Sequence, residues 1–586
     1  MARLDPHSFC DDDQPQTTGL DWHVTVDFER RVLRGTAALT FATPGTGPLD
    51  LDTRDLTLHA AATLDGRPVA FTVDAPDAIL GSRLRLSLPA DTAGVRLTYE
   101  TSPDASALQW LTPRQTFGGV HPFLFTQCQA IHARSVVPIQ DTPRVRIRFT
   151  AELFVPAALK ALMAAAFVSR EVRGDVAIER WEMPQSIPPY LFAFAVGELV
   201  SRELGPRSRV WAEPGRVDAA AWEFAPADHM LTAAESLFGP YPWDRFDVLN
   251  MPPSFPYGGM ENPRLTFLTP SLLAGDRSLV NVLAHELAHS WTGNLVTNAN
   301  AEHFWLNEGF TVYAERRIQE VLEGPEVVAL HEALGRQGLD EALAEFADRP
   351  ELTHLRTHLR GVNPDEAYSQ VPYEKGYLFL KTLELSVGRP AFDAFLRRYI
   401  ENFGFQSITT DQFTEFAERA LPGALAGVDA AAWIEGPGLP ENAPQSVSVR
   451  LKAVEALGPA LPAPAQAAAW TPAEWQLYLQ RMARHAEVAP CAALDAGYRL
   501  TESQNFEVLV AWLELSALAG YSHTLNRLEA VLGEVGRMKY LRPLYRVLAS
   551  RPETHDRALR CFERFGPGYH PIARQVIGNL LGLHGG

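Results

Sequence analysis

Two histidines four residues apart, with a glutamate directly after the first, lie in the stretch VLAHELAHSWTGNLV at residues 282–296. On a helix, His285 and His289 would project from one face about one turn apart, so that their imidazoles can bind a single metal ion. Glu286 would lie about 100° further round the helix, beside the metal and within reach of a water molecule. H-E-x-x-H on a helix is typical of zinc hydrolases, in which the glutamate is the general base. The pattern predicts a catalytic site with one Zn²⁺ per chain.

The alternative is a surface helix that carries these residues by chance. The helix is apolar around the motif, at Val282, Leu283, Ala284, Leu287 and Ala288. The polar groups would therefore be buried, and buried histidine and glutamate need partners, which a metal ion supplies. The context favours the metal site.

A catalytic zinc site needs a third protein ligand and an open coordination position. One class of zinc peptidases has a third histidine six residues after the second, and here that residue is Leu295. The other common solution is a glutamate from a following helix, and HFWLNEGFTVYAE provides two candidates. We expect Glu308, with 18 residues between it and His289, to be the ligand. Glu315 either orients a ligand histidine or is an ordinary helical surface glutamate.

A glycine-rich stretch, FPYGGMENP, precedes the motif at residues 255–263. Gly258 and Gly259 allow a backbone segment to pass very close to another chain. Glu261 could pair with a cation at the end of a cleft, and a substrate α-ammonium there would make the protein an exopeptidase. Taken alone, such a stretch is more often a loop than a substrate clamp.

The elements that must position these residues change in type along the chain. Segments such as DWHVTVDFE, SRLRLSLPA, GVRLTYE and RVRIRFTAELFVP alternate apolar and polar residues between about residues 20 and 155. This alternation predicts a largely antiparallel sheet with one buried face. Helical stretches follow after about residue 200, a Pro-rich linker lies near 437–446, and the remainder reads as helices with apolar stripes, as at Leu525, Leu528, Leu532 and Val535.

We therefore predict a multidomain α+β protein with three folded parts. The limits are an N-terminal β-sheet domain at 1–198, a catalytic domain at 199–436, a linker at 437–450, and an all-α, armadillo-like helical array at 451–586. The length of 586 residues agrees with several domains.

The composition excludes several classes of protein. A net charge of −18 argues against nucleic acid as a partner. The four cysteines form no C-x-x-C pair, which indicates neither a disulfide framework nor a thiolate zinc site. The first residues lack the apolar core of a secretory signal, and no run reaches the length of a membrane span. We expect a cytoplasmic monomer that binds peptides and neither nucleic acid nor membrane.

Taken together, several motifs resemble those of peptidase family M1 zinc aminopeptidases. These are GGMEN, HELAH, WLNEGF and AYSQVPYEKG. Within the family, FTQCQAIHARSVVPIQDTP, SITTDQF and GRMKYLRPLY are similar to the leukotriene A4 hydrolase and aminopeptidase B group. The resemblance covers almost the whole chain and implies a β-rich N-terminal domain, a thermolysin-like zinc catalytic domain and an all-α C-terminal helical domain.

The resemblance also implies roles for individual residues. His285, His289 and Glu308 would bind zinc, Glu286 would be the general base, and Tyr373 would donate to the tetrahedral intermediate. Glu261 would bind the substrate amine. The other implied substrate-binding residues are Tyr257, Gly258, Gly259, Met260, Gln127, Gln129, Asp365, Tyr368, Arg537 and Lys539.

Two of these assignments suggest a substrate preference. Asp365 with Gln127 would suit a basic first residue, and Arg537 with Lys539 would hold the carboxylate end of a short peptide such as a tripeptide. Residues i and i+2 on one regular helix do not face the same way, which counts against the second pair. A turn or helix start after Gly536 would remove that objection.

Two other functions stay open at this point. The first is hydrolysis of a lipid epoxide, the second activity of the leukotriene A4 hydrolase group, which would need a long apolar tunnel. The second is a non-enzymatic binding protein with a vestigial zinc site, and the intact ligands and base argue against it.

Overall fold

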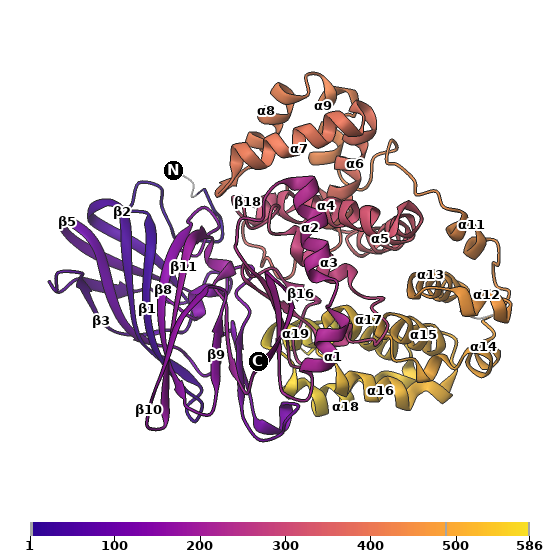
Figure 1. Ribbon diagram of the computed structural model, residues 1–586, viewed down its shortest axis with the longest axis horizontal. Coiled ribbons are helices and arrows are strands. Elements are labelled where there is room, and N and C mark those ends of the chain that lie inside the picture. Colours follow the sequence, from indigo (N-terminus) through magenta and orange to yellow (C-terminus); the bar gives the residue numbers. More distant parts are fainter. Residues whose placement is uncertain (1–3, 487–488, 584–586) are drawn as a thin grey trace.

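The computed structural model describes residues 4–486 and 489–583, which form three regions (Figure 1). A β-rich region occupies the N-terminal part, a mixed region with most of the long helices follows, and an array of helices forms the C-terminal part. The predicted multidomain α+β architecture is confirmed. In the described part of the chain, no helix is both long enough and apolar enough to cross a membrane.

An eight-stranded sheet dominates the N-terminal region, with the order β10-β11-β8-β1-β2-β5-β3 and β4 paired to β5. Its pairs are antiparallel except β1 with β8, which run parallel. Its strands are β1 (Thr17–Asp27), β2 (Val32–Thr53), β3 (Thr57–Thr63), β4 (Ala70–Val73), β5 (Ser82–Glu100), β8 (Ile147–Pro156), β10 (Ala166–Arg173) and β11 (Val176–Ile187). A second, four-stranded sheet contains β6 (Leu108–Leu111), β7 (Phe123–Thr126), β9 (Lys160–Met163) and β12 (Phe194–Gly197).

The alternating sequence explains how the large sheet buries one face. In β1, Trp22, Val24 and Val26 are buried while the residues between them are more accessible. The indole of Trp22 donates to the hydroxyl of Tyr99 at 2.8 Å, so its one polar group is satisfied inside the core. The two segments SRLRLSLPA and GVRLTYE form a single strand, β5, because its partner β2 absorbs the irregularity with register shifts around Gly45.

A five-stranded sheet supports the catalytic region, with the order β13-β14-β15-β17-β16. Its strands are β13 (Val200–Gly205), β14 (Ser208–Ala212), β15 (Phe246–Asn250), β16 (Gly259–Met260) and β17 (Leu265–Leu268). The short strand β16 lies at the edge of this sheet and consists of Gly259 and Met260 from the glycine-rich motif. An edge strand offers unpaired backbone groups to an extended peptide.

Helices surround this sheet and carry the metal-binding motif. They are α1 (Val217–Glu223), α2 (Ala227–Phe238), α3 (Asn281–Ala288), α4 (Trp305–Glu323), α5 (Pro325–Glu345), α6 (Gly376–Val387), α7 (Arg389–Phe403), α8 (Thr410–Ala420), α9 (Ala424–Gly427) and α10 (Ala430–Ile434). A two-stranded pair, β18 (Val296–Asn298) and β19 (Gln406–Ile408), runs parallel beside them. Helix α3 is shorter than its helical sequence pattern suggested, but His289 follows it directly and still donates its N–H to the carbonyl of His285.

Helices α4 and α6 approach so closely that their backbones touch. A Cβ atom on Gly309 would lie 2.7 Å from the Cα of Gly376, and one on Gly376 would lie 2.8 Å from the Cα of Gly309. Gly309 follows Glu308, and Gly376 follows the π-helical turn Val371–Lys375 that carries Tyr373. The two glycines therefore fix the distance between Glu308 and Tyr373.

The C-terminal helices form their own core and lie against the catalytic region. They are α11 (Val449–Glu455), α12 (Pro464–Ala469), α13 (Pro472–Ala483), α14 (Cys491–Tyr498), α15 (Phe506–Leu518), α16 (Leu525–Glu534), α17 (Met538–Ala549), α18 (Pro552–Phe565) and α19 (Pro571–Leu580). At the contact, the N–H of Gly536 donates to the carbonyl of Pro253 at 2.6 Å, and that of Met538 to Pro256 at 2.8 Å. These backbone bonds fix the start of α17 beside the glycine-rich motif.

We predict that Gly309→Ala destabilises the protein. The added methyl group would overlap backbone atoms of α6 that cannot move independently, at a cost of about 1–3 kcal/mol. Thermal unfolding should begin at a lower temperature than in the wild type. Gly338→Ala is the matched control, since its Cβ would meet only a side-chain atom of Gln370 at 3.5 Å. Equal unfolding temperatures for the two variants would contradict the close approach.

Candidate active site

Three side chains bring one ligand atom each to a common point. Nε2 of His285 and Nε2 of His289 lie 3.1 Å apart, and Oε2 of Glu308 lies 3.4 Å from the first and 3.5 Å from the second. Ligands at 2.0–2.1 Å from one tetrahedral zinc ion lie about 3.3 Å from one another. Oε2 of Glu308 is buried and makes no hydrogen bond of ordinary geometry within the described chain. The donor set and its spacing therefore fit a zinc ion.

The hydrogen bonds of the two rings point the correct nitrogens at this position. Nδ1 of His285 lies 3.0 Å from Oε2 of Glu315, and Nδ1 of His289 lies 3.1 Å from the carbonyl of Thr292. A carboxylate and a carbonyl only accept, so both Nδ1 atoms carry the hydrogen and both Nε2 atoms are free to bind metal. Glu315 is thus buried against a ligand ring and is not a surface glutamate.

Burial and neighbouring carboxylates set the protonation of this pair. Burial lowers the pKa of His289 to about 4, which keeps it as the neutral imidazole that binds metal. Although burial opposes it, the neighbouring carboxylates of Glu308 and Glu315 raise the pKa of His285 above its usual range. The same contact with His285 lowers the pKa of Glu315 in spite of its burial.

Glu286 lies between the histidines and the glycine-rich edge strand. A Cβ atom on Gly259 would lie 2.3 Å from Oε1 of Glu286, so only glycine leaves room for this carboxylate. Burial raises the pKa of Glu286 to about 8. A carboxylate with such a raised pKa can both take and return a proton near neutral pH.

Glu261 lies on the same side of the site as Glu286. Carboxylate oxygens of both residues lie within 4.8 Å of a ring nitrogen of His289. Burial raises the pKa of Glu261 above its usual range, and nearby Glu308 and Glu286 add to the shift. The amide of Gln129 donates to Oε1 of Glu261 at 3.4 Å. A buried carboxylate at the end of a peptide-binding edge is well placed to pair with a cation.

Tyr373 reaches the site from the π-helical turn. Its ring lies nearly parallel to that of His285, with centroids 6.1 Å apart, and its hydroxyl donates to the hydroxyl of Tyr368 at 3.1 Å. Burial raises the pKa of Tyr373 above its usual range, so the phenol stays protonated and can donate to an oxyanion.

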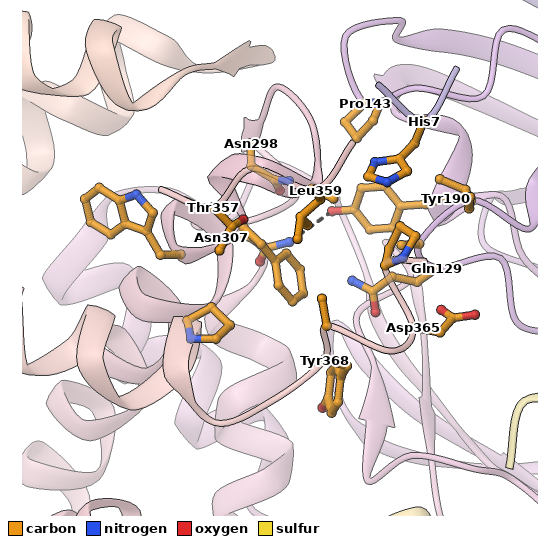
Figure 2. Close-up of a pocket in the computed structure, with 18 of the residues that line it drawn as sticks. His7, Gln129, Pro143, Tyr190, Asn298, Asn307, Thr357, Leu359, Asp365 and Tyr368 are labelled. Atoms are coloured by element: carbon orange, nitrogen blue, oxygen red, sulfur yellow. Dashed lines mark hydrogen bonds between the residues drawn. The ribbon is translucent and has the colours of Figure 1, made fainter. Parts of the chain in front are cut away.

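A cavity with about 950 Å³ of empty space, part of it open to solvent, adjoins this centre through Gln129 and Tyr368, which contact Glu261 and Tyr373 (Figure 2). Gln129, Tyr257, Tyr368 and Asp365 line it, but Gln127 does not, because its amide donates to the sulfur of Met260. Of the two residues expected to suit a basic first residue, Asp365 therefore lines the cavity and Gln127 lies outside its lining. Asp365 accepts from Nε2 of His132 at 2.8 Å.

Arg537 and Lys539 lie at the start of α17. Arg537 precedes the helix with an extended backbone, so the objection from regular helical spacing does not apply. A Cβ atom on Gly258 would lie 2.7 Å from Nη2 of Arg537, which places this guanidinium against the edge strand. Both cations bind Glu507, at 3.2 Å from Nη1 of Arg537 and 2.7 Å from Nζ of Lys539.

Sequence reasoning missed His132, Glu507 and the glycine pair Gly309 and Gly376. His132 stands inside FTQCQAIHARSVVPIQDTP, but its partner Asp365 is more than two hundred residues away. Glu507 is an ordinary glutamate near the start of α15, and nothing local signals that it accepts from two cations. The glycines adjoin WLNEGF and VPYEK, and a glycine beside each motif was the one available signal.

Three family models match successive parts of the chain. They are the peptidase M1 N-terminal domain at residues 16–191, the peptidase family M1 domain at 222–432, and the leukotriene A4 hydrolase C-terminal domain at 470–581. A leukotriene A-4 hydrolase from Xenopus laevis is 37% identical over 98% of this chain and 99% of its own length. The chain belongs to peptidase family M1.

Similarity to other members of the family supports the same assignment. A leucine aminopeptidase 2 from Neurospora crassa is 35% identical over 99% of this chain and 90% of its own length. The solved structure of a yeast LTA4 hydrolase in complex with bestatin is 33% identical, covers 99% of this chain and 97% of that one, and superposes with a TM-score of 0.91. The family thus spans all three regions of the fold.

We predict that Glu315→Ala weakens Zn²⁺ binding by about 10- to 100-fold, since loss of the carboxylate frees the ring of His285 to rotate and lowers its basicity. Equilibrium dialysis against buffered zinc measures the dissociation constant. Glu323→Ala, on the last turn of the same helix and exposed, is the control. An unchanged zinc affinity in Glu315→Ala would refute the orienting role.

Proposed function

We propose that this protein is a zinc-dependent aminopeptidase that releases N-terminal residues from short peptides. One observation carries the proposal: the triangle of His285, His289 and Glu308 has the spacing of zinc ligands, and the buried Glu261 carboxylate lies beside it. A metal that activates water, next to a carboxylate that pairs with an ammonium, supports cleavage one residue from the N-terminus. Membership of family M1 and the similarity to a leucine aminopeptidase 2 support the same activity.

His285, His289 and Glu308 would hold the zinc ion through Nε2, Nε2 and Oε2. When bound there, zinc supplies a lowered pKa for water and polarises a carbonyl oxygen. A cation also offsets the mutual repulsion of four buried carboxylates in the described site, those of Glu261, Glu286, Glu308 and Glu315.

Glu286 would act as general base and then as general acid. Its carboxylate takes a proton from the attacking water and passes it to the leaving amine. Tyr373 donates its hydroxyl hydrogen to the oxyanion that develops on the scissile carbonyl. Because Tyr373 already donates to Tyr368, the switch to the oxyanion requires only a rotation of its hydroxyl.

The two ends of a short peptide would meet opposite charges. Glu261, with Gln129 beside it, would bind the α-ammonium, and strand β16 with Tyr257, Gly258, Gly259 and Met260 would lie along the peptide backbone. Arg537 and Lys539 would bind the free carboxylate, which favours tripeptides over long chains. Asp365 in the cavity would favour a basic first residue.

Hydrolysis of a lipid epoxide is the second candidate. The similarity to a leukotriene A-4 hydrolase and the presence of Asp365 and Tyr368 on one cavity favour it. Turnover of an epoxide lipid, as opposed to inactivation by it, distinguishes this activity from peptide hydrolysis alone.

Further proposals concern organisation and context. We propose domain limits of 1–198, 199–436, 437–450 and 451–586, supported by the absence of helix or strand between Ile434 and Val449 in the described chain. We also propose that the protein acts as a monomer in the cytoplasm, without nucleic acid or membrane as partners.

The decisive test is release of the first residue from arginine-, leucine- and alanine-headed tripeptides, with and without a zinc chelator. Chelator-sensitive cleavage of free N-termini only is the expected result, because Glu261 needs an ammonium. Cleavage of N-acetylated tripeptides at comparable rates would keep the zinc site but refute the role of Glu261 and make the protein an endopeptidase.

We predict that Glu286→Gln abolishes turnover and retains zinc. The amide keeps the size of the side chain against Gly259 but cannot accept the proton from water. Metal analysis should show one zinc per chain, while tripeptide hydrolysis should fall by a factor of at least about 10². Loss of zinc in this variant would place Glu286 among the ligands and contradict the assignment.

A further inference from the structure

The cavity beside the reaction centre ends against the N-terminal segment, residues 4–9. Tyr368, which contacts Tyr373, lies at one end of the close-up, and His7 and Pro143 lie at the other, with Asn298 beside Leu359 (Figure 2). The same cavity is lined by all of these residues except Tyr373. Its inner end is therefore built by the N-terminal segment, strand β18 and the loop before Tyr368.

The N-terminal segment is held firmly by buried polar contacts. Oδ2 of Asp5 accepts from the hydroxyl of Thr142 at 2.6 Å. Asp52 accepts from the hydroxyl of Ser8 at 2.6 Å and from the N–H of Phe9 at 2.7 Å. A side chain on this segment has a fixed position and can serve as part of a binding site.

His7 presents an unpaired acceptor at this end. Its side chain is 2% exposed, and its Nε2 lies 2.9 Å from the carbonyl of Val362. A carbonyl only accepts, so Nε2 carries the hydrogen and Nδ1 of the neutral ring is an acceptor. Nδ1 is buried without a hydrogen-bond partner in the described chain, and Asp5 is 3.9 Å from it, beyond hydrogen-bond distance.

Asn298 presents a second unpaired acceptor. Its Nδ2 donates to the carbonyl of Asn300 at 2.8 Å, which fixes the orientation of the amide, since the reverse orientation would set two oxygens together. Its Oδ1 is buried, again without a partner among the described residues. Oδ1 of Asn307, on the same cavity, also lacks a donor among the described residues, and buried polar groups in native proteins are nearly always paired.

We propose that His7 and Asn298 form a polar subsite at the inner end of this cavity that selects chains ending in a hydrogen-bond donor. The occupant is the side chain of the first residue of a peptide, with a terminal hydroxyl or ammonium group. An alkyl chain of the same length would leave both acceptors unpaired and would displace any water bound to them, so it is rejected.

This inference rests on the proposed function in one respect: an amine bound at Glu261 directs the attached chain into the cavity past Tyr368. Apolar residues of the cavity lining, among them Ile131, Phe304 and Leu355, suit the methylene groups of such a chain. Because its end is polar, this cavity is not a purely apolar tunnel, and it also disfavours ligands with a long alkyl tail.

The test uses two series of competitive inhibitors of tripeptide hydrolysis. One series is straight-chain alkylamines from butyl to dodecyl, and the other has a hydroxyl in place of the terminal methyl group. Both carry the ammonium that Glu261 would bind. At the chain length that reaches His7, the amino alcohol should bind about tenfold more tightly than the alkylamine of equal length. His7→Leu and Asn298→Leu should each remove or reverse this preference.

His358→Leu is the matched control, because His358 is exposed and does not line the cavity, and it should keep the wild-type preference. Alkylamines that bind as tightly as amino alcohols at every length in the wild-type enzyme would overturn the subsite, even if both leucine variants failed to fold. An unchanged preference in folded His7→Leu and Asn298→Leu would also overturn it. Failure of both series to inhibit an active enzyme would instead count against Glu261 as the amine-binding residue.

Discussion

The whole site depends on three ligand atoms that two helices hold 3.1–3.5 Å apart. Helix α3 supplies the imidazole of His285, His289 at the end of this helix supplies the second one turn later, and α4 supplies the carboxylate of Glu308 at its first turn. These side chains are largely buried, and each histidine is oriented by an acceptor at Nδ1. A set of this geometry is preorganised for a cation, and a bound cation would offset the negative charge around it.

Two glycines at the edge strand, Gly258 and Gly259, bring the backbone close to charged side chains beside the candidate metal site. Gly259 lies against Glu286 and Gly258 against Arg537, so this stretch of backbone passes between a carboxylate of the catalytic region and a cation from the C-terminal region. A side chain at either position would displace a charged group. The catalytic and C-terminal regions therefore meet at these two glycines, and we propose that the carboxylate of Glu261 and the cations Arg537 and Lys539 mark the two ends of a peptide cleft there. A cleft with opposite charges at its two ends matches the two charged termini of a short peptide.

The cavity beside the site is built by segments that lie far apart in the sequence. Asp365 is held by His132, and His132 in turn contacts Ser106 and Arg54 of the β-rich region. The N-terminal segment supplies His7 to the same cavity that Tyr368 enters from the catalytic region. The β-rich region thus shapes the pocket for the first residue as well as supporting the fold.

The sequence by itself determined the local chemistry. H-E-x-x-H requires only helical periodicity to bring His285 and His289 together, and the next helix offers Glu308 and Glu315 as candidates for a third ligand, of which the spacing favours Glu308. The alternation in β1 and the apolar stripe of α16 likewise predict their elements from local period alone. Only the tertiary structure decided that Glu315 contacts His285, that Gly309 and Gly376 meet, that Glu507 binds both Arg537 and Lys539, and that Gln127 contacts Met260 while Asp365 contacts His132. These contacts join residues whose separation along the chain carries no periodic signal, and they form because packing and burial of charge are satisfied only in the complete fold.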